Sequence, residues 1–246
     1  MKIAIIAITP EGRRIGQELC ETLIGSEVYL LTKPGSLRKT VEKIFDQYEG
    51  LVFVMALGIV IRVIAPFIKS KYEDPAVVVV DEGRRFAISA LSGHEGGANL
   101  LAVEVGSILG AEPVITTASE AKKDLIVGVG CRKGTSSEEI IDAIDEALRA
   151  AGRSRQEVRW VVSIDLKREE PGLRQACQSL GIPFRTISSD LVKRFSGPYR
   201  RSSLVKEKIG VEGVCEPCAL IAGRRTSLLV PKHKRGRVCV AIAREN

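Results

Sequence analysis

The chain has 246 residues, of which 45% are hydrophobic and 27% charged, with 37 Lys+Arg against 30 Asp+Glu. This composition excludes a disordered, collagen-like or disulfide-stapled chain, and the length suits one large domain or two small ones. The charge is unevenly distributed, because residues 1–124 carry a net −2 and residues 125–246 a net +9. The second half is therefore expected to favour an anionic partner.

Neither a membrane span nor a secretory signal is expected. No stretch approaches the roughly 20 apolar residues that a membrane helix needs, and the apolar run after Met1 is too short for a signal peptide. A cytoplasmic chain follows, with its six cysteines as free thiols. The pair Cys215-x-x-Cys218 stands alone, so small buried residues are favoured over a redox site, and no metal site is predicted.

The first half alternates apolar runs with helical periodicity, which predicts an α/β domain. Strands are predicted at 3–8, 28–31, 51–55 and 114–117, with a hairpin formed by 76–80 and 86–90. Helices are predicted at 15–23, 36–48, 59–68 and 98–109, with Pro66 ending or kinking the third of them, and a turn is predicted at 33–35.

A polar segment at 118–124 indicates a domain boundary, which divides the chain into residues 1–120 and 121–246. Each domain is expected to be a mostly parallel or mixed sheet flanked by helices. In the second domain, strands are predicted at 125–129, 158–164 and 184–187. Helices are predicted after Ser136 and at 173–180, a mobile loop at 196–203, and a basic hairpin from 227–230 and 238–243.

Three loops place small residues between a strand and a helix, where backbone can approach a ligand closely: 55–58, 92–99 and 128–135. The second loop holds His94 and Glu95, a pair capable of acid–base chemistry, with helix capping as the alternative. The third has the glycine spacing of neither a dinucleotide fingerprint nor a P-loop. For this third loop, a tight structural turn and an anion cradle remain equally open. Arg62, within an apolar helix, either reaches out to solvent or meets a carboxylate near Gly58.

These segments resemble the CbiG family of anaerobic cobalamin-biosynthesis proteins. The first half carries the motifs LVFVMALGIVIRVIAP at 51–66, DPAVVVVDE at 74–82 and LSGHEGGAN at 91–99, as in the family's N-terminal domain. The second half carries VGVGCRKGT at 127–135 and GVCEP at 213–217, as in its C-terminal domain and the similar CobE protein. The family usually has a middle segment between the two domains, and this chain has only a few residues there.

The resemblance implies a cobalt-precorrin-5A hydrolase, which opens the ring A δ-lactone of a contracted tetrapyrrole so that a two-carbon fragment leaves as acetaldehyde. The substrate is a polyanion that carries its own cobalt, so no cofactor is expected. Neighbouring enzymes of the pathway are expected as further partners. The basic second half, with the run 232–237, suits such a ligand.

On this basis we expect His94 or Glu95 to activate water, the backbone N–H groups of Gly96 and Gly97 to stabilise the oxyanion, and Arg62 and Arg132 to hold carboxylates. The expected substrate-binding residues are Gly58, Arg62, Gly93, Gly96, Gly97, Asn99, Gly128, Gly130, Cys131, Arg132, Lys133, Gly134, Thr135 and Glu216.

Two other functions compete with hydrolysis. A chain without the middle segment could bind and channel corrinoid intermediates without catalysis. A nucleic-acid binder would also suit the basic half, but the chain has only one Trp and four Tyr for stacking and no nucleic-acid motif. No nucleic-acid partner is therefore predicted.

Overall fold

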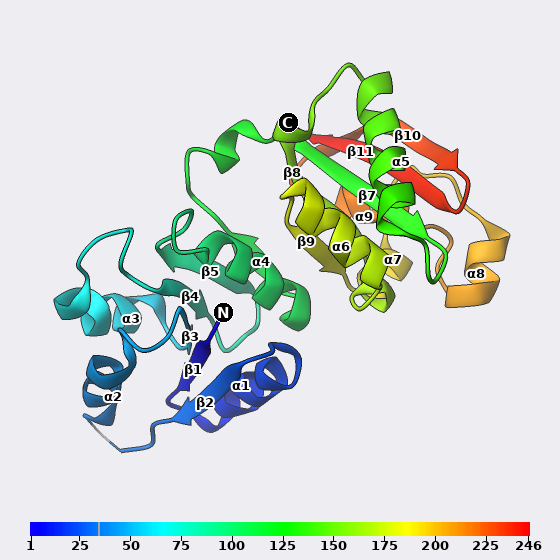
Figure 1. Ribbon diagram of the computed structural model, residues 1–246. Coiled ribbons are helices and arrows are strands. Elements are labelled where there is room, and N and C mark those ends of the chain that lie inside the picture. Colours follow the sequence, from blue (N-terminus) through cyan, green and yellow to red (C-terminus); the bar gives the residue numbers. More distant parts are fainter. Residues whose placement is uncertain (34) are drawn as a thin grey trace. The chain divides into compact units, whose positions relative to one another are not determined.

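The computed structural model describes residues 1–33 and 35–246, so the turn predicted at 33–35 falls partly outside the described residues. The chain divides into two compact units, Met1–Thr117 and Ala118–Asn246. Each unit is a sheet flanked by helices, which confirms the predicted α/β class (Figure 1).

The sheet of unit 1 has the strand order β2-β1-β3-β4-β5-β6. Strands β1 to β4 run parallel, whereas β5 runs antiparallel to β4, and β6 runs parallel to β5. The strands are β1 Ile3–Ala7, β2 Ser26–Leu30, β3 Gly50–Val54, β4 Ala76–Val80, β5 Phe86–Leu91 and β6 Glu112–Val114.

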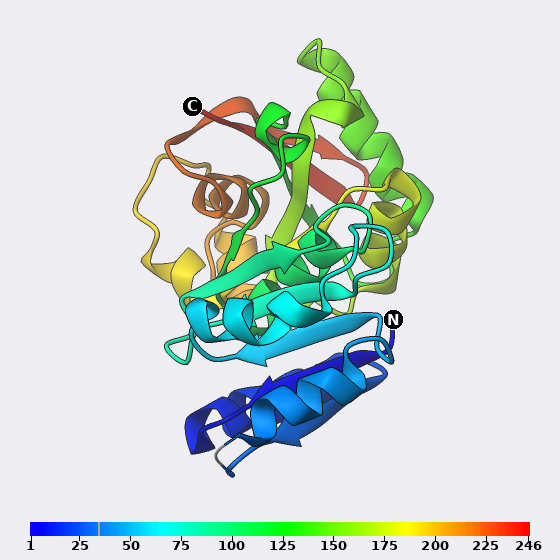
Figure 2. The same ribbon diagram turned by 90° about the vertical axis from the view of Figure 1, so that its left-hand side faces the viewer.

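Helices cover both faces of this sheet, because its central strands are apolar on both sides. Side chains of α1 and α4 share one core cluster with the strands, and those of α2 and α3 share the other. Figure 2 shows α2 and α3 in front of the strands. The helices are α1 Pro10–Thr22, α2 Ser36–Ile44, α3 Leu57–Ile64 and α4 Ala98–Leu109.

Several predicted boundaries in unit 1 differ from the structure; helix α1, for example, begins at Pro10 rather than at residue 15. Helix α2 ends at Ile44, and Tyr48 is still buried because the turn that follows folds it onto the same core. The last strand lies at Glu112–Val114 and not at 114–117. The expected interruption at Pro66 is confirmed, because helix α3 ends at Ile64 and a short 3-10 turn, Ala65–Phe67, contains this proline.

The sheet of unit 2 has the order β10-β11-β7-β8-β9. Strands β7, β8 and β9 are parallel, and the hairpin β10–β11 runs antiparallel to β7. The strands are β7 Leu125–Cys131, β8 Val158–Ile164, β9 Phe184–Ile187, β10 Thr226–Arg235 and β11 Val238–Glu245.

One face of this sheet packs on α5 and α6, whose apolar stripes complete the core cluster of unit 2. Helix α9 packs on β7, β8 and β11 and also contacts α7. The helices are α5 Ser137–Ala150, α6 Pro171–Leu180, α7 Ser189–Arg194, α8 Ser203–Ile209 and α9 Cys215–Ala222.

Several sequence expectations for unit 2 need correction, and the short helices α7 and α8 were not predicted. Residues 232–235 belong to strand β10 and not to the loop of the hairpin, because the ladder with β11 resumes after two register shifts. Helix α9 was not predicted, since its first turn is buried all round and therefore lacks a polar face. No helix within the described ranges is long and apolar enough to cross a membrane.

Candidate functional site

The carboxyl edge of the parallel strands in unit 1 contains a topological switch point. The chain leaves β1 toward β2 on one side and returns to β3 on the other. Open α/β sheets bind ligands at such a crevice. Thr9 lies there after β1, caps α1 by accepting the Gly12 N–H at 3.0 Å, and donates to Glu82 at 2.5 Å. Gly58 lies in the first turn of α3, directly after β3.

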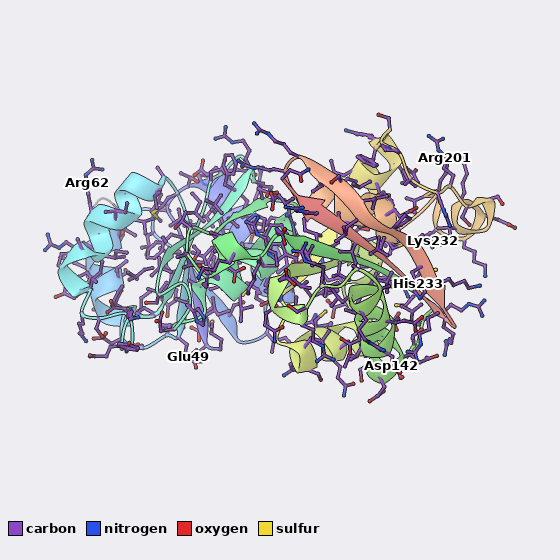
Figure 3. The ribbon with its side chains drawn as sticks, turned by 90° about the horizontal axis from the view of Figure 1, so that it is seen from above. Glu49, Arg62, Asp142, Arg201, Lys232 and His233 are labelled. Atoms are coloured by element: carbon purple, nitrogen blue, oxygen red, sulfur yellow. The ribbon has the colours of Figure 1, made fainter. Side chains whose placement is uncertain are left out.

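Arg62 turns back onto its own helix at this edge. Its guanidinium donates to the carbonyl of Gly58 at 3.0 Å, and the side chain is exposed (Figure 3). A methyl group added at Gly58 would meet only the Arg62 side chain, at 3.4 Å. Gly58 therefore leaves open space beside one charged group, which suits a carboxylate ligand.

The loop that carries His94 lies at the opposite edge of the same sheet. Strand β5 runs antiparallel to β4, with Leu91 beside Val77 at the start of β4. The loop after β5 therefore meets the amino ends of the parallel strands, a strand length or about 17 Å from their carboxyl ends. The structure does not bring Arg62 and His94 together within unit 1.

Loop 92–97 has a constrained backbone. Ser92 has φ +53° and Gly97 has φ +86°, both left-handed. The N–H of Gly96 donates to the carbonyl of Ser92 at 3.1 Å, so it is already used within the loop. A methyl group at Gly96 would lie 2.5 Å from the Ser92 Cβ. Only glycine fits there, and the reason is packing inside the loop.

Asn99 also acts inside this region. Its Oδ1 accepts from the Ser89 hydroxyl at 2.8 Å, and its Nδ2 donates to the Thr117 hydroxyl at 3.0 Å. A methyl group at Gly93 would lie 2.8 Å from Asn99 Oδ1. Gly93 and Asn99 therefore close the base of the loop between β5 and the end of β6.

His94 and Glu95 are exposed at the tip of the loop and differ in their surroundings. The Lys71 ammonium lies 2.6 Å from the Glu95 carboxylate, and this hydrogen bond lowers the pKa of Glu95. A carboxylate held in its ionised form is a weak proton acceptor. Of the two side chains, the His94 imidazole is therefore the better candidate for a base, since histidine is the most common general base in enzymes.

Two buried polar residues beneath the loop, Asp74 and Ser92, were not among the site residues predicted from the sequence. Asp74 is 5% exposed and Ser92 is 7% exposed, and neither Asp74 Oδ2 nor Ser92 Oγ has a hydrogen-bond partner among the described residues. Both residues lie against Gly96. Unpaired buried atoms beside a left-handed serine mark a strained loop, which is typical of functional segments. The signal available in the sequence was the carboxylate of Asp74, which lies just before the buried strand β4.

In unit 2, the glycines of loop 128–135, expected to form an anion site, allow close packing within the protein. A methyl group at Gly128 would lie 1.9 Å from the carbonyl oxygen of Cys215, so this glycine lets α9 approach β7. The N–H of Gly134 donates to the buried Glu170 carboxylate at 2.8 Å. Arg237 covers the loop from the hairpin, donating to the carbonyl of Lys133 at 2.8 Å. These contacts favour the structural turn over the anion cradle.

The other residues expected in this loop have separate surroundings. Gly130 lies against Val214, and the Thr135 hydroxyl donates to the carbonyl of Arg132 at 2.7 Å. Burial raises the pKa of the half-buried Cys131 thiol. The side chains of Arg132 and Lys133 are exposed and, within the described chain, make no ion pair.

The expected residue Glu216 is buried in the first turn of α9 and is 2% exposed. Its carboxylate accepts the backbone N–H of Arg200 at 2.7 Å and that of Lys232 at 2.9 Å. Both carboxylate oxygens of Glu216 thus accept hydrogen bonds from backbone N–H groups. A role for Glu216 in direct contact with substrate stays a prediction.

The pair Cys215 and Cys218 lies at the start of α9 with both thiols free and buried. Burial raises the pKa of Cys215 to about 12 and that of Cys218 well above its ordinary value. Thiols of this kind are poor nucleophiles. Within the part of the chain that the structure describes, no group of three or more His, Cys, Asp or Glu side chains could hold a metal ion.

The structure thus defines a protein of two α/β units, each with a glycine-containing loop at strand ends. The family model described as Cobalamin synthesis G N-terminal matches residues 39–120, and Cobalamin synthesis G C-terminus matches 125–243. The chain therefore belongs to the cobalamin synthesis G, or CbiG, family.

The chain is also similar to individual proteins. A cobalt-precorrin-5A hydrolase from Priestia megaterium is 27% identical over 98% of this chain and 94% of its own length. Protein CobE from Sinorhizobium sp. is 32% identical over 51% of this chain and 82% of its own. A solved cobalamin biosynthesis protein G homologue from Sulfolobus solfataricus is 24% identical, covers 99% of this chain and 97% of that chain, and has a TM-score of 0.41.

The comparison with the Priestia protein also bears on the middle segment. The alignment runs over 352 positions against the 246 residues of this chain, so more than 100 positions lie opposite gaps here. The two family matches are separated by residues 121–124 alone. The two family matches thus confirm the expected short connection between the two halves.

Proposed function

We propose that this chain is a cobalt-precorrin-5A hydrolase, which opens the ring A δ-lactone of a cobalt-containing tetrapyrrole with release of acetaldehyde. One observation carries the proposal: both halves of the CbiG family match in order, and relatives named for this activity align along 88% or more of the chain. Hydrolysis of the lactone gives a carboxylate and a free hydroxyl, and the two-carbon fragment then leaves.

The proposed reacting centre is loop 92–97. His94 takes a proton from water, which attacks the lactone carbonyl. Glu95, held ionised by Lys71 at 2.6 Å, stabilises the imidazolium that forms next to it. Gly97 is the remaining candidate for an oxyanion donor, since the Gly96 N–H is bonded to Ser92.

Arg62 and Gly58 belong to a second contact with the substrate in this proposal. They lie at the other edge of the sheet, so they are not assigned to the reacting atoms. Within unit 2, the exposed side chains of Arg132 and Lys133 are proposed contacts for carboxylates, and the net charge of residues 125–246 is +9. A substrate with acetate and propionate groups offers several carboxylates to such residues.

The proposal includes no cofactor, because the cobalt is part of the substrate. It places the protein in the cytoplasm, among the other enzymes that handle the same intermediates. The segments expected to contact the substrate are polar or glycine-rich loops rather than a lipid-facing surface.

A second candidate is a non-catalytic protein that binds and delivers corrinoid intermediates. The observation that favours it is the gap of more than 100 positions opposite the Priestia hydrolase. If the corresponding residues of the relative close over its substrate, a chain without them would bind the substrate but would not exclude water from it.

One experiment separates these candidates. The purified chain is incubated with cobalt-precorrin-5A, the products are analysed by mass spectrometry, and acetaldehyde is trapped and quantified. A ring-opened product with stoichiometric acetaldehyde supports the hydrolase. Tight binding of the intact substrate without acetaldehyde supports the carrier.

A further inference from the structure

Glu216 is a buried carboxylate whose partners are both backbone groups. It is 2% exposed, and its oxygens accept the N–H of Arg200 at 2.7 Å and of Lys232 at 2.9 Å. A buried charge is costly unless hydrogen bonds satisfy it. These two donors, together with the start of α9, provide that stabilisation.

The two donors come from segments far apart in sequence. Arg200 lies between α7 and α8, where the chain has no regular structure. Lys232 lies in β10, where the ladder with β11 shifts register between Val230 and His233. Because one carboxylate binds both N–H groups, residues 200 and 232 are held side by side.

The side chains at these two positions keep their charge unneutralised. Neither Arg200 nor Lys232 makes an ion pair with an acidic side chain among residues 1–33 and 35–246. Their sequence neighbours differ: Arg201 lies 3.0 Å from Glu212, and His233 lies 2.9 Å from Glu146. Figure 3 shows Arg201, Lys232 and His233 together at one end of unit 2.

We propose that Glu216 is a positioning residue that holds Arg200 and Lys232 as a paired cationic site for carboxylates of the substrate. This rests on the proposed function, because the ligand class is the tetrapyrrole polycarboxylate. Glu216 itself does not touch the ligand. It fixes two backbones, and the arginine and lysine side chains make the charge-assisted hydrogen bonds.

A steady-state experiment tests this role. We compare the wild type with Glu216→Gln, Lys232→Ala and the double variant, measuring kcat and KM at several salt concentrations. A glutamine keeps one acceptor oxygen but places an NH2 group against the second N–H. We expect Glu216→Gln to raise KM roughly tenfold, to leave kcat unchanged, and to weaken the salt dependence of KM.

The double variant distinguishes positioning from a general structural role. If Glu216 acts through Lys232, adding Glu216→Gln to Lys232→Ala changes KM little. Fully additive effects, or a lower kcat at unchanged KM, would overturn the proposal. Arg155→Ala is the matched control, since Arg155 is exposed and pairs with Asp145.

Two further measurements cover the remaining outcomes. If Glu216→Gln does not fold, Arg200→Ala with Lys232→Ala removes the cations and keeps the backbone bonds to Glu216, and an unchanged KM then overturns the proposal. Binding of uroporphyrin, a tetrapyrrole polycarboxylate, is titrated by fluorescence. If uroporphyrin binding depends on salt and weakens in these variants, the cationic site is supported. If the wild type then releases no acetaldehyde, the hydrolase proposal alone is rejected.

Discussion

The Glu170 carboxylate accepts the N–H of Gly134 at 2.8 Å, so the glycine loop of unit 2 already holds an anion that belongs to the protein. Lys167 pairs with the same carboxylate at 2.7 Å. The loop, the start of α6 and the short turn before it are thereby joined by one buried side chain. The following prediction tests that arrangement.

Replacing Glu170 by Ala should lower the free energy of unfolding by about 1–3 kcal/mol, because it leaves the Gly134 N–H and the Lys167 ammonium without their acceptor. Urea denaturation measures the change. Glu169→Gln is the matched control, since Glu169 is 71% exposed and pairs with Arg174 at the surface. Equal effects of the two substitutions would show that burial of Glu170 contributes nothing.

The stability of the fold should depend on pH through Glu170. Burial alone would raise the pKa of this carboxyl, but the hydrogen bonds from Lys167 and Gly134 outweigh it and the pKa lies below the ordinary 4.5. The stabilisation is therefore present above about pH 4.5 and is lost as the pH falls through the folded pKa. In Glu170→Gln, the unfolding free energy should vary less between about pH 5 and pH 3. Identical profiles for variant and wild type would contradict this.

His94→Ala should lower kcat by about 10²–10⁴-fold, the usual contribution of a general base. Glu95→Gln should lower it less, because the carboxylate supports the imidazole and does not take the proton. Because His94 is exposed, the thermal unfolding midpoint of the His94→Ala variant should equal that of the wild type. Acetaldehyde release measures turnover, with Glu73→Gln as a control carboxylate in the neighbouring segment. Wild-type turnover in both His94→Ala and Glu95→Gln would exclude this centre.

Gly58 and Gly128 should respond differently to alanine. At Gly128 the methyl group would lie 1.9 Å from a backbone oxygen, so Gly128→Ala should cost about 1–3 kcal/mol or more. Gly58→Ala should be neutral or stabilise the helix by about 0.5–1 kcal/mol. If ligand approaches Gly58, the same variant raises KM. Urea denaturation and steady-state kinetics on both variants decide this, and a folded Gly58→Ala with wild-type KM would remove Gly58 from the site.

Cys218 should resist alkylation in the native protein, because it is fully buried and its thiol pKa is raised well above the ordinary value. Cys20, Cys131 and Cys239 are half-buried and should react first. Peptide mass spectrometry after treatment with iodoacetamide locates the modified residues. A disulfide between Cys215 and Cys218 under mild oxidation would contradict the buried, non-redox assignment.

The sequence predicted the α/β class and most elements, since buried parallel strands and amphipathic helices leave clear apolar patterns. It failed at α9, whose first turn is buried on every side and so has no periodic signal. It also indicated loop 92–97 and His94 through their glycine-rich surroundings. It could not indicate Lys71 or Glu170, because each depends on a partner distant along the chain.

The sequence by itself determined which loops are rich in glycine, where the charge lies, and which family the motifs resemble. Only the tertiary structure decided which of these loops share an edge. The antiparallel direction of β5 places His94 at the amino ends of the parallel strands and Arg62 at their carboxyl ends. Strand direction is set by long-range pairing and not by the local residue pattern. For that reason Arg62 and His94, both expected to contact the substrate, lie at opposite edges of the sheet.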